Sequence, residues 1–338
     1  MISPVQPALA TLAAEVERRS AAVGRPIRVD IAAAADRSDV LALRPPGVWS
    51  PNRGTRLVQA ADGWIVANLP READRQAVPA WVGGALDTDP WTAVARRARS
   101  RPWRALVDQA RLLGLPVAGV GEVRAATTAA PLRRLGERRR RDAVQVLDLS
   151  SLWAGPLCGA LLAQAGFAVT KLESARRPDA MRDGAPAFFA RLNHGKEQAR
   201  LDFTEPLGRA DLRRRFESAD IVITGARLRA FEQLGLAPAE VFAANPGLVW
   251  VAISGYGFLG EAADRVAFGD DASAAGALVR WTAAGAPRFL GDAPADPLTG
   301  FAAAAGAFAA LARGGGLLVD AALARTAAGA AAQLGLLR

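Results

Sequence analysis

The hydrophobic pattern of the chain changes near residue 143. From there on, short runs rich in Val, Leu and Ile alternate with longer stretches whose apolar residues recur every three or four positions. Buried strands are predicted for the runs at 144–147, 168–172, 220–224 and 248–253. Strands that alternate with helices favour a parallel sheet covered on both faces. We therefore predict an α/β protein with a Rossmann-like parallel sheet domain.

The first part of the chain has a different pattern. Its first 24 residues predict an amphipathic helix, and residues 27–32 a short strand. Two further short strands, 55–58 and 64–68, flank an Asp-Gly turn typical of a hairpin, and three helical stretches follow. We predict a second, smaller α+β domain over 1–125, an Arg/Pro-containing linker over 126–142, and the sheet domain over 143–338.

One segment of the sheet domain, Val144 to Glu173, predicts a complete βαβ unit. Gly155 and Pro156 form a turn after the first strand, and an apolar helix is predicted over 157–164. Free backbone N–H groups and the helix dipole at such a helix start favour a phosphate. The segment therefore predicts a nucleotide-like ligand across residues 150–157.

The scarcity of two residue types limits the possible chemistry. The chain has one cysteine, Cys158, and one histidine, His194. An intramolecular disulfide and a His/Cys metal cluster are therefore excluded, and we predict no metal and a cytoplasmic location. Carboxylates become the leading candidates for covalent catalysis, unless His194 serves.

The charge of the chain is strongly positive, with a formal net charge of +9. The basic residues are nearly all arginines in an Ala/Gly-rich sequence, and the run Arg138 to Arg141 lacks interleaved aromatic residues. This is typical of a GC-rich genome, so we predict no nucleic-acid partner. Arg313 interrupts the longest apolar segment, so we predict no membrane span.

Asp296 is the most informative carboxylate. It precedes Pro297 and an apolar helix predicted over 298–312, so it could be an N-cap. The same position would keep an ionised carboxylate exposed in a loop, where it could attack an activated acyl group. Asp292 reads as a turn residue, and the pair Asp270-Asp271 as the cap of another helix, near 272–281.

Six segments, taken in order, resemble the class III coenzyme A transferases, the CaiB/BaiF or formyl-CoA transferase-like family. They are spread over residues 144 to about 330, which is more than half of the chain. They read VLDLSSLWAGPLCGALLAQAGFAVTKLE, NHGK with LDFT, ADIVIT with LGL, NPGLVWVAISGYG, DPLTGFAAAAGAFAAL and GGGLLVDAALA.

The resemblance implies a site. Asp296, four residues before Gly300, falls at the position of the family's nucleophilic aspartate, although Ala295 stands where glycine is usual. The residues implied to lie along coenzyme A are Trp153, Ala154, Gly155, Pro156, Lys171, Asn193 and Lys196. The partners would be an acyl-CoA and a carboxylic acid, exchanging coenzyme A through an aspartyl anhydride and an aspartyl thioester.

Two segments of the first part of the chain resemble the smaller domain of the family, which comes later in the family's sequences. They read RGTRLVQAADGWIVANL and DPWTAVARRARSRPWRALVDQARLLGLPVAGV. Here they come first, so the resemblance implies a circularly permuted chain. The family's members form interlocked dimers, and we expect a homodimer. Related racemases use a His-Asp pair in a Gly-His-Asp segment. Gly269-Asp270-Asp271 lacks that histidine, which disfavours racemisation.

Two alternatives remain from the sequence. A Rossmann enzyme that uses a nicotinamide or S-adenosylmethionine would share the βαβ pattern, but the G-x-G-x-x-G spacing is absent from Val144 to Glu173. The chain could also be a catalytically inactive partner subunit that binds CoA. The absence of a glycine-only loop like the one that covers the family's nucleophile keeps this second alternative open.

Overall fold

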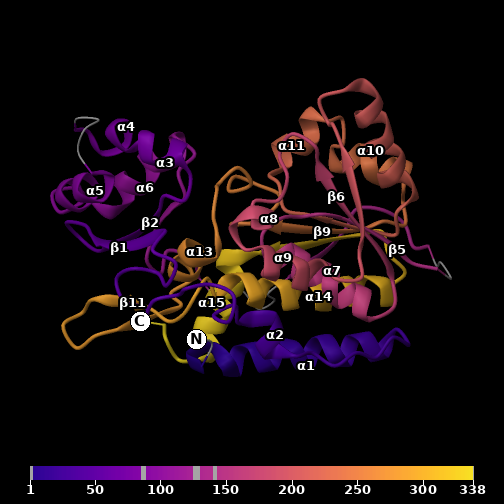
Figure 1. Ribbon diagram of the computed structural model, residues 1–338, viewed down its shortest axis with the longest axis horizontal. Helices are drawn as coiled ribbons and strands as arrows, with labels where there is room; N and C mark the ends of the chain where they lie inside the picture. Colours follow the sequence, from indigo (N-terminus) through magenta and orange to yellow (C-terminus); the bar gives the residue numbers. More distant parts are fainter. Residues whose placement is uncertain (1–2, 85–88, 125–129, 140–142, 338) are drawn as a thin grey trace.

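A computed structural model of the protein describes residues 3–84, 89–124, 130–139 and 143–337 (Figure 1). Its largest feature is a seven-stranded sheet with the order β4-β12-β9-β8-β5-β6-β7. The strands are β4 (Leu132–Arg134), β5 (Gln145–Leu149), β6 (Ala168–Ser174), β7 (Glu197–Leu201), β8 (Ile221–Thr224), β9 (Val249–Ser254) and β12 (Leu317–Ala322).

Six of these strands run parallel, and only the edge strand β4 is antiparallel to its neighbour β12. The chain starts the parallel set at β5, moves outward through β6 and β7, and then returns to the other side of β5 with β8, β9 and β12. This is the doubly wound order, and ligands of such sheets bind beyond the carboxyl ends of the strands where the order reverses. The reversal lies between β5 and β8. The predicted α/β class with a parallel sheet is confirmed.

Helices cover both faces of the sheet because its strands are apolar on both sides. Val249 and Val251 of β9 belong to the cluster beneath the sheet, and Leu248 and Trp250 to the cluster above it. The lower face carries α7 (Ala154–Gln164), α9 (Pro186–Asn193) and α14 (Ala295–Ala312) (Figure 1). The upper face carries α10 (Pro206–Ser218), α11 (Leu228–Gln233) and α12 (Pro238–Ala244).

Helix α14 is the centre of the lower layer. It packs against α7, β9 and β12 on one side and against α1 (Gln6–Ala22) and α15 (Leu323–Gln333) on others. By length and composition α14 could span a membrane, but most of it is buried inside the fold. Its apolar sequence is therefore explained by its central position, because a helix surrounded by other elements is apolar on all sides.

A smaller unit lies beside the sheet. It contains a three-stranded antiparallel sheet of β1 (Thr55–Gln59), β2 (Trp64–Asn68) and β3 (Val117–Gly119) and four helices. The helices are α3 (Glu72–Gln76), α4 (Val78–Val82), α5 (Pro90–Ala98) and α6 (Trp103–Leu112). Of these, α4, α5 and α6 contribute to a separate hydrophobic cluster. This unit joins the large one through α13 (Gly269–Ala275), which contacts β2 and β3.

The remaining described elements are η1 (Ser3–Val5), α2 (Ile31–Ala35), α8 (Met181–Gly184) and the hairpin of β10 (Val279–Trp281) and β11 (Pro287–Phe289).

Two predicted elements are wrong. Residues 27–32 do not form a strand, because the Asp30 carboxylate accepts a hydrogen bond from the Ala33 backbone N–H and caps the short helix α2. The helix predicted near 272–281 ends at Gly276, Ala277 takes a left-handed conformation with φ of 62°, and the chain continues as β10.

The hydrophobic contacts also cut across the predicted domain ranges. Helix α1 belongs to the cluster of the large sheet through Leu9 and Val16, although the predicted small domain includes it. Residues 132–134 of the predicted linker form the edge strand β4. Arg140 and Arg141 of the arginine run lie outside the described residues.

Candidate functional site

Asp296 lies in the first turn of α14, as its second residue. The prediction that it is the N-cap is wrong, because Pro294 holds that position and the Asp296 backbone N–H donates to Ala293 O at 2.9 Å. Its carboxylate is therefore not used to cap the helix. It is partly exposed and lines two cavities at once.

Gly269, the first residue of α13, approaches the Asp296 carboxylate closely. A Cβ atom at Gly269 would lie 2.1 Å from Asp296 Oδ2, a distance that no side chain allows. The nearby Gly269 backbone also lowers the pKa of this carboxylate, against the effect of burial. Only glycine leaves room for this contact. The contact between Gly269 and Asp296 was not predicted, although the position of Gly269 directly before the Asp270-Asp271 pair was a usable signal.

The pKa of Asp296 is raised from 3.8 to about 7. Burial is the largest cause, Arg37 opposes it, and the neighbouring carboxylates Asp270 and Asp292 raise the pKa further. The pKa of Asp270 is likewise raised, to about 6, by burial and then by Asp292. Raised carboxylate pKa values in a cavity are typical of a functional site.

Arg37 is the cation of this cluster. Its guanidinium pairs with the carboxylate of Asp292, through Nε to Oδ2 at 2.6 Å and Nη2 to Oδ1 at 3.1 Å, and lies 4.5 Å from the ring centroid of Trp153. Asp292 is therefore an ion-pair partner as well as a loop residue. Arg37 comes from the N-terminal part of the chain, some 255 residues from Asp292, so no local sequence signal could identify the pair.

The first cavity, here called the strand-end pocket, lies beyond the carboxyl ends of β5, β8 and β9, where the strand order reverses. Its volume is about 430 Å³. Its walls come from residues 149–152, 225–227, 253–255 and 265–268, and from Ala154, Gly155, Ala263, Asp296 and Leu323. Four arginines line it, namely Arg227 and Arg265 of these ranges together with Arg71 and Arg177. The pocket is therefore basic and rich in small residues, as a phosphate-bearing ligand requires.

The second cavity, here called the loop-side pocket, has a volume of about 510 Å³. Its lining comes from the loop 52–54, from 68–70, 152–153 and 268–270, and from Arg37, Arg75, Trp91, Met181, Ala293 and Asp296. Asp296, Leu152 and Phe268 line both cavities. Asp296 therefore lies at the junction of two pockets, each of which is lined by several arginines.

The predicted coenzyme-binding residues divide into two groups. Ala154 and Gly155 line the strand-end pocket, and Trp153 lines the loop-side pocket. The predicted loop at 154–156 is wrong, because these residues form the first turn of α7. Pro156 is buried, and its carbonyl oxygen accepts a hydrogen bond from Lys196 Nζ at 2.8 Å.

The second group, Lys171, Lys196 and Asn193, is buried behind α7. Lys196 Nζ bonds Asp148 Oδ2 at 2.8 Å and Asn193 Oδ1 at 3.1 Å. Lys171 Nζ lies 3.3 Å from Asp179 Oδ2 and also bonds the Ser150 carbonyl oxygen. Both lysine side chains are fully buried, and neither lysine is among the described residues that line the two pockets. Their partners therefore lie within the protein.

The two residue types that are rare in the sequence lie away from the junction. His194 is exposed at the end of α9. Cys158 is buried in α7, and burial raises the pKa of its thiol, so it is a core residue. Among the described residues, no group of His, Cys, Asp and Glu side chains is arranged to hold a metal ion.

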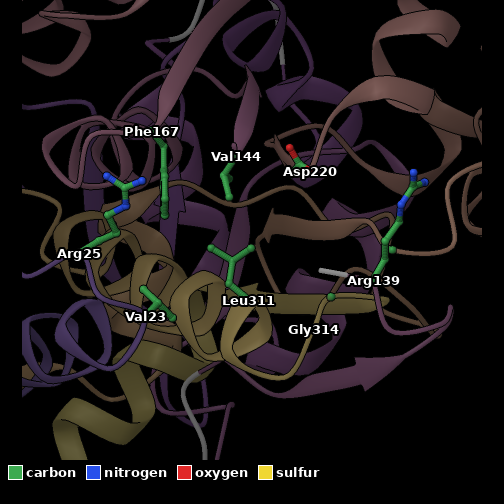
Figure 2. Close-up of a pocket in the computed structure, with 10 residues that line it drawn as sticks. Val23, Arg25, Arg139, Val144, Phe167, Asp220, Leu311 and Gly314 are labelled. Carbon is green, nitrogen blue, oxygen red and sulfur yellow. The ribbon is translucent and has the colours of Figure 1, made fainter. Parts of the chain in front are cut away.

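A further cavity lies at the opposite end of the sheet (Figure 2). Arg25, Arg139, Phe167 and Leu311 line it, together with Val144 and Asp220, which directly precede β5 and β8. It therefore lies at the amino ends of the strands, where doubly wound sheets do not place their ligands. Figure 2 shows Arg25 and Arg139 on opposite sides of the cavity, and Asp296 is not among the residues that line it.

Residues 142–335 match the model of CoA-transferase family III. The chain is 34% identical over 182 residues to the succinyl-CoA–D-citramalate CoA-transferase of Chloroflexus aurantiacus, a match that covers 51% of this chain and 45% of that protein. It is 32% identical over 118 residues to human alpha-methylacyl-CoA racemase, covering 35% and 29%.

Among solved structures, a CAIB/BAIF family protein from Brucella suis superposes with a TM-score of 0.53 at 30% identity, covering 58% of this chain and 56% of that chain. The chain thus spans 45% of the length of the citramalate CoA-transferase and 29% of the length of the racemase.

Proposed function

Because the chain belongs to CoA-transferase family III, we propose that it moves coenzyme A between an acyl-CoA and a carboxylic acid, with Asp296 as the nucleophile. One observation carries the proposal. The Asp296 carboxylate lies at the junction of two pockets, held beside the Gly269 backbone and not used as a helix cap. A transferase needs such a junction, because its nucleophile must face the thioester of one ligand and the carboxylate of another.

We place coenzyme A in the strand-end pocket. Its phosphates carry negative charge, and Arg71, Arg177, Arg227 and Arg265 line this pocket together with the first turn of α7. Guanidinium groups and a helix start both favour phosphate. The buried lysines Lys171 and Lys196 would act on the coenzyme indirectly. Lys171 holds Ser150 of the pocket wall, and Lys196 holds Pro156, which follows Gly155 of that wall.

The proposed reaction begins when an Asp296 oxygen attacks the thioester carbonyl carbon. The C–S bond breaks, CoA leaves as a thiolate, and a mixed anhydride remains on Asp296. The thiolate then attacks the aspartyl carbonyl carbon, which releases the donor acid as a carboxylate and forms an aspartyl-CoA thioester. The acceptor carboxylate repeats both steps in reverse and regenerates Asp296. No water and no net proton is consumed, so water must be excluded from the junction.

The proposal predicts a pH dependence. Only the ionised carboxylate attacks, and burial places the pKa of Asp296 at about 7. The rate of adduct formation at low acyl-CoA concentration should therefore rise by roughly 20-fold between pH 5.5 and pH 7.5 and level off above that. This rate is measured by mass spectrometry of reactions stopped at successive times, and circular dichroism at each pH is the control for folding. A rate independent of pH over this range would contradict the assignment.

The test of the function itself is chemical trapping. The protein is incubated with a panel of acyl-CoAs, hydroxylamine or borohydride is added, and the modified residue is mapped by mass spectrometry. Modification at Asp296 supports the proposal. Tight CoA binding without an adduct from any donor favours a catalytically inactive partner subunit. Binding of NADH or S-adenosylmethionine without CoA binding favours the other Rossmann-type enzymes.

Racemisation is a second activity known among the relatives, since one of them is a racemase. The geometry does not favour it here. Both oxygens of Asp270, the residue in place of histidine, already accept hydrogen bonds, from Ala293 N at 2.9 Å and from Thr55 Oγ1 and Asn52 Nδ2 at 3.1 Å. A carboxylate held in this way is poorly placed to move a substrate proton. Deuterium incorporation from D₂O next to the thioester would show the contrary.

We also propose that the chain is a circular permutation of the family order. In Figure 1 the two termini lie close together, and Gln333 Nε2 donates a hydrogen bond to Thr11 Oγ1 at 2.8 Å. A variant that starts at Val144, joins residue 338 to residue 1 through a short Gly/Ser linker and ends at Gly136 should fold with the same circular dichroism spectrum and bind CoA with unchanged affinity. An insoluble product, or one that does not bind CoA, would contradict the permutation.

The homodimer expected from the resemblance is also a proposal, and sedimentation equilibrium tests it.

A further inference from the structure

The loop-side pocket contains a cation whose charge is not neutralised by any described residue. Arg37 pairs with Asp292, and Arg75 bonds Glu72 Oε2 and the Leu69 carbonyl oxygen, each at 3.1 Å. Arg53 also lines the pocket, but within the described ranges its side chain has no hydrogen-bond or ion-pair partner. This pocket therefore presents a free guanidinium.

The backbone that carries Arg53 is held firmly. Arg53 has a left-handed conformation with φ of 63°, which is uncommon for residues other than glycine. Its N–H donates to Ser50 O at 3.0 Å. The neighbouring Asn52 accepts from the Gly54 N–H at 2.8 Å and donates to Asp270 Oδ2 at 3.1 Å. The loop is thus tied to α13, the helix that begins beside Asp296.

Much of the remaining wall of the pocket is apolar. Leu69, Trp91, Leu152, Met181 and Phe268 contribute to it. A ligand that satisfies this wall has a hydrocarbon body, one carboxylate that reacts at Asp296, and a second anionic group that reaches Arg53. Carboxylate is the group that a guanidinium binds with two parallel hydrogen bonds.

We propose that Arg53 is a specificity-determining residue that binds the remote carboxylate of a dicarboxylic acid, as the free acceptor and as the acyl group of the acyl-CoA. The inference rests on the proposed function. It deepens that function by assigning the substrate class to a pocket and a residue. The competing occupant of Arg53 is a phosphate of coenzyme A, which the strand-end pocket can bind with its own four arginines.

The test compares acids of equal length that differ only in the second carboxylate. CoA transfer is measured to succinate against butyrate and to adipate against hexanoate, in the unchanged protein and in Arg53→Gln, Arg53→Lys and Arg44→Gln. Arg44 is the matched control, because it is an exposed arginine close to Arg53 along the chain that does not line the pocket. Trapping at Asp296 is run in parallel.

The unchanged protein should prefer each dicarboxylic acid at least about tenfold in kcat/KM. Arg53→Gln should lose that preference and keep its rates with monocarboxylic acids within about twofold, since only the charge-assisted bond is removed. Arg53→Lys should retain part of the preference, and Arg44→Gln all of it.

Two outcomes overturn the inference alone. The first is that Asp296 forms adducts but the protein shows no preference for dicarboxylic acids. The second is that Arg53→Gln raises the KM for the acyl-CoA equally with both types of acid, because Arg53 would then bind the coenzyme. If no acyl-CoA modifies Asp296, the proposed function fails first.

Discussion

Asp296→Asn is expected to lower the rate of CoA transfer by at least about a thousandfold and to abolish the trapped adduct. Asparagine has nearly the same shape, but its amide cannot attack a thioester to form an anhydride. Because Asp296 does not cap α14, the substitution removes no helix-capping bond. The measurement is CoA transfer under saturating conditions together with mass spectrometry of the trapped protein.

The stability of this variant provides the control. In the folded protein the pKa of Asp296 is raised from 3.8 to about 7, so the folded state binds the proton more tightly than the unfolded state. The stability that this proton contributes is full below about pH 4 and is lost as the pH rises through about 7. At pH 8 the asparagine variant should therefore be at least as stable as the unchanged protein. An inactive variant that also unfolds would not identify a nucleophile, and an active one would exclude Asp296.

Lys196→Met is expected to reduce the free energy of unfolding by about 3–5 kcal/mol, because it leaves Asp148 as an unpaired charge in the core. Both side chains of this pair are fully buried. Burial by itself would raise the pKa of Asp148, but Lys196 and Lys171 outweigh it and hold that pKa below its usual range. Urea denaturation at pH 7 measures the loss.

The matched control is Arg176→Met. Arg176 Nε lies 2.7 Å from Asp202 Oδ2, but this pair is on the surface, so the denaturation midpoint should hardly change. CoA binding separates the two roles considered for Lys196. If the Lys196→Met protein keeps nearly all of its stability but binds CoA far more weakly than the unchanged protein, Lys196 is a coenzyme-binding residue.

The sheet could be predicted because its strands differ from everything around them. A parallel strand covered on both faces is a short continuous apolar run, and the runs at 144–147, 168–172, 220–224 and 248–253 correspond to β5, β6, β8 and β9. The hairpin of β1 and β2 was also predictable, since Asp62-Gly63 suits its turn. The class of the fold therefore follows from local patterns.

The errors arose where a distant contact or a single bond decided the conformation. The Asp30 carboxylate caps a helix over residues 31–35 through one hydrogen bond from the Ala33 N–H. The left-handed conformation of Ala277 interrupts a helical pattern that continues in the sequence. Lys171 and Lys196 were expected to lie along coenzyme A, but the fold encloses them with Asp179 and Asp148. Whether a charge faces solvent or a buried partner depends on the packing of several elements.

By itself, the sequence determined the α/β class, the βαβ unit at Val144 to Glu173, and Asp296 as the candidate carboxylate. These depend on hydrophobic periodicity and on motifs within a few residues of one another. Only the tertiary structure decided that Gly269 and Arg37 lie at Asp296, that two pockets meet there, and that Arg53 stands unpaired in one of them. The physical reason is that distances, desolvation and charge balance are set between segments far apart in the chain, and no local pattern records them.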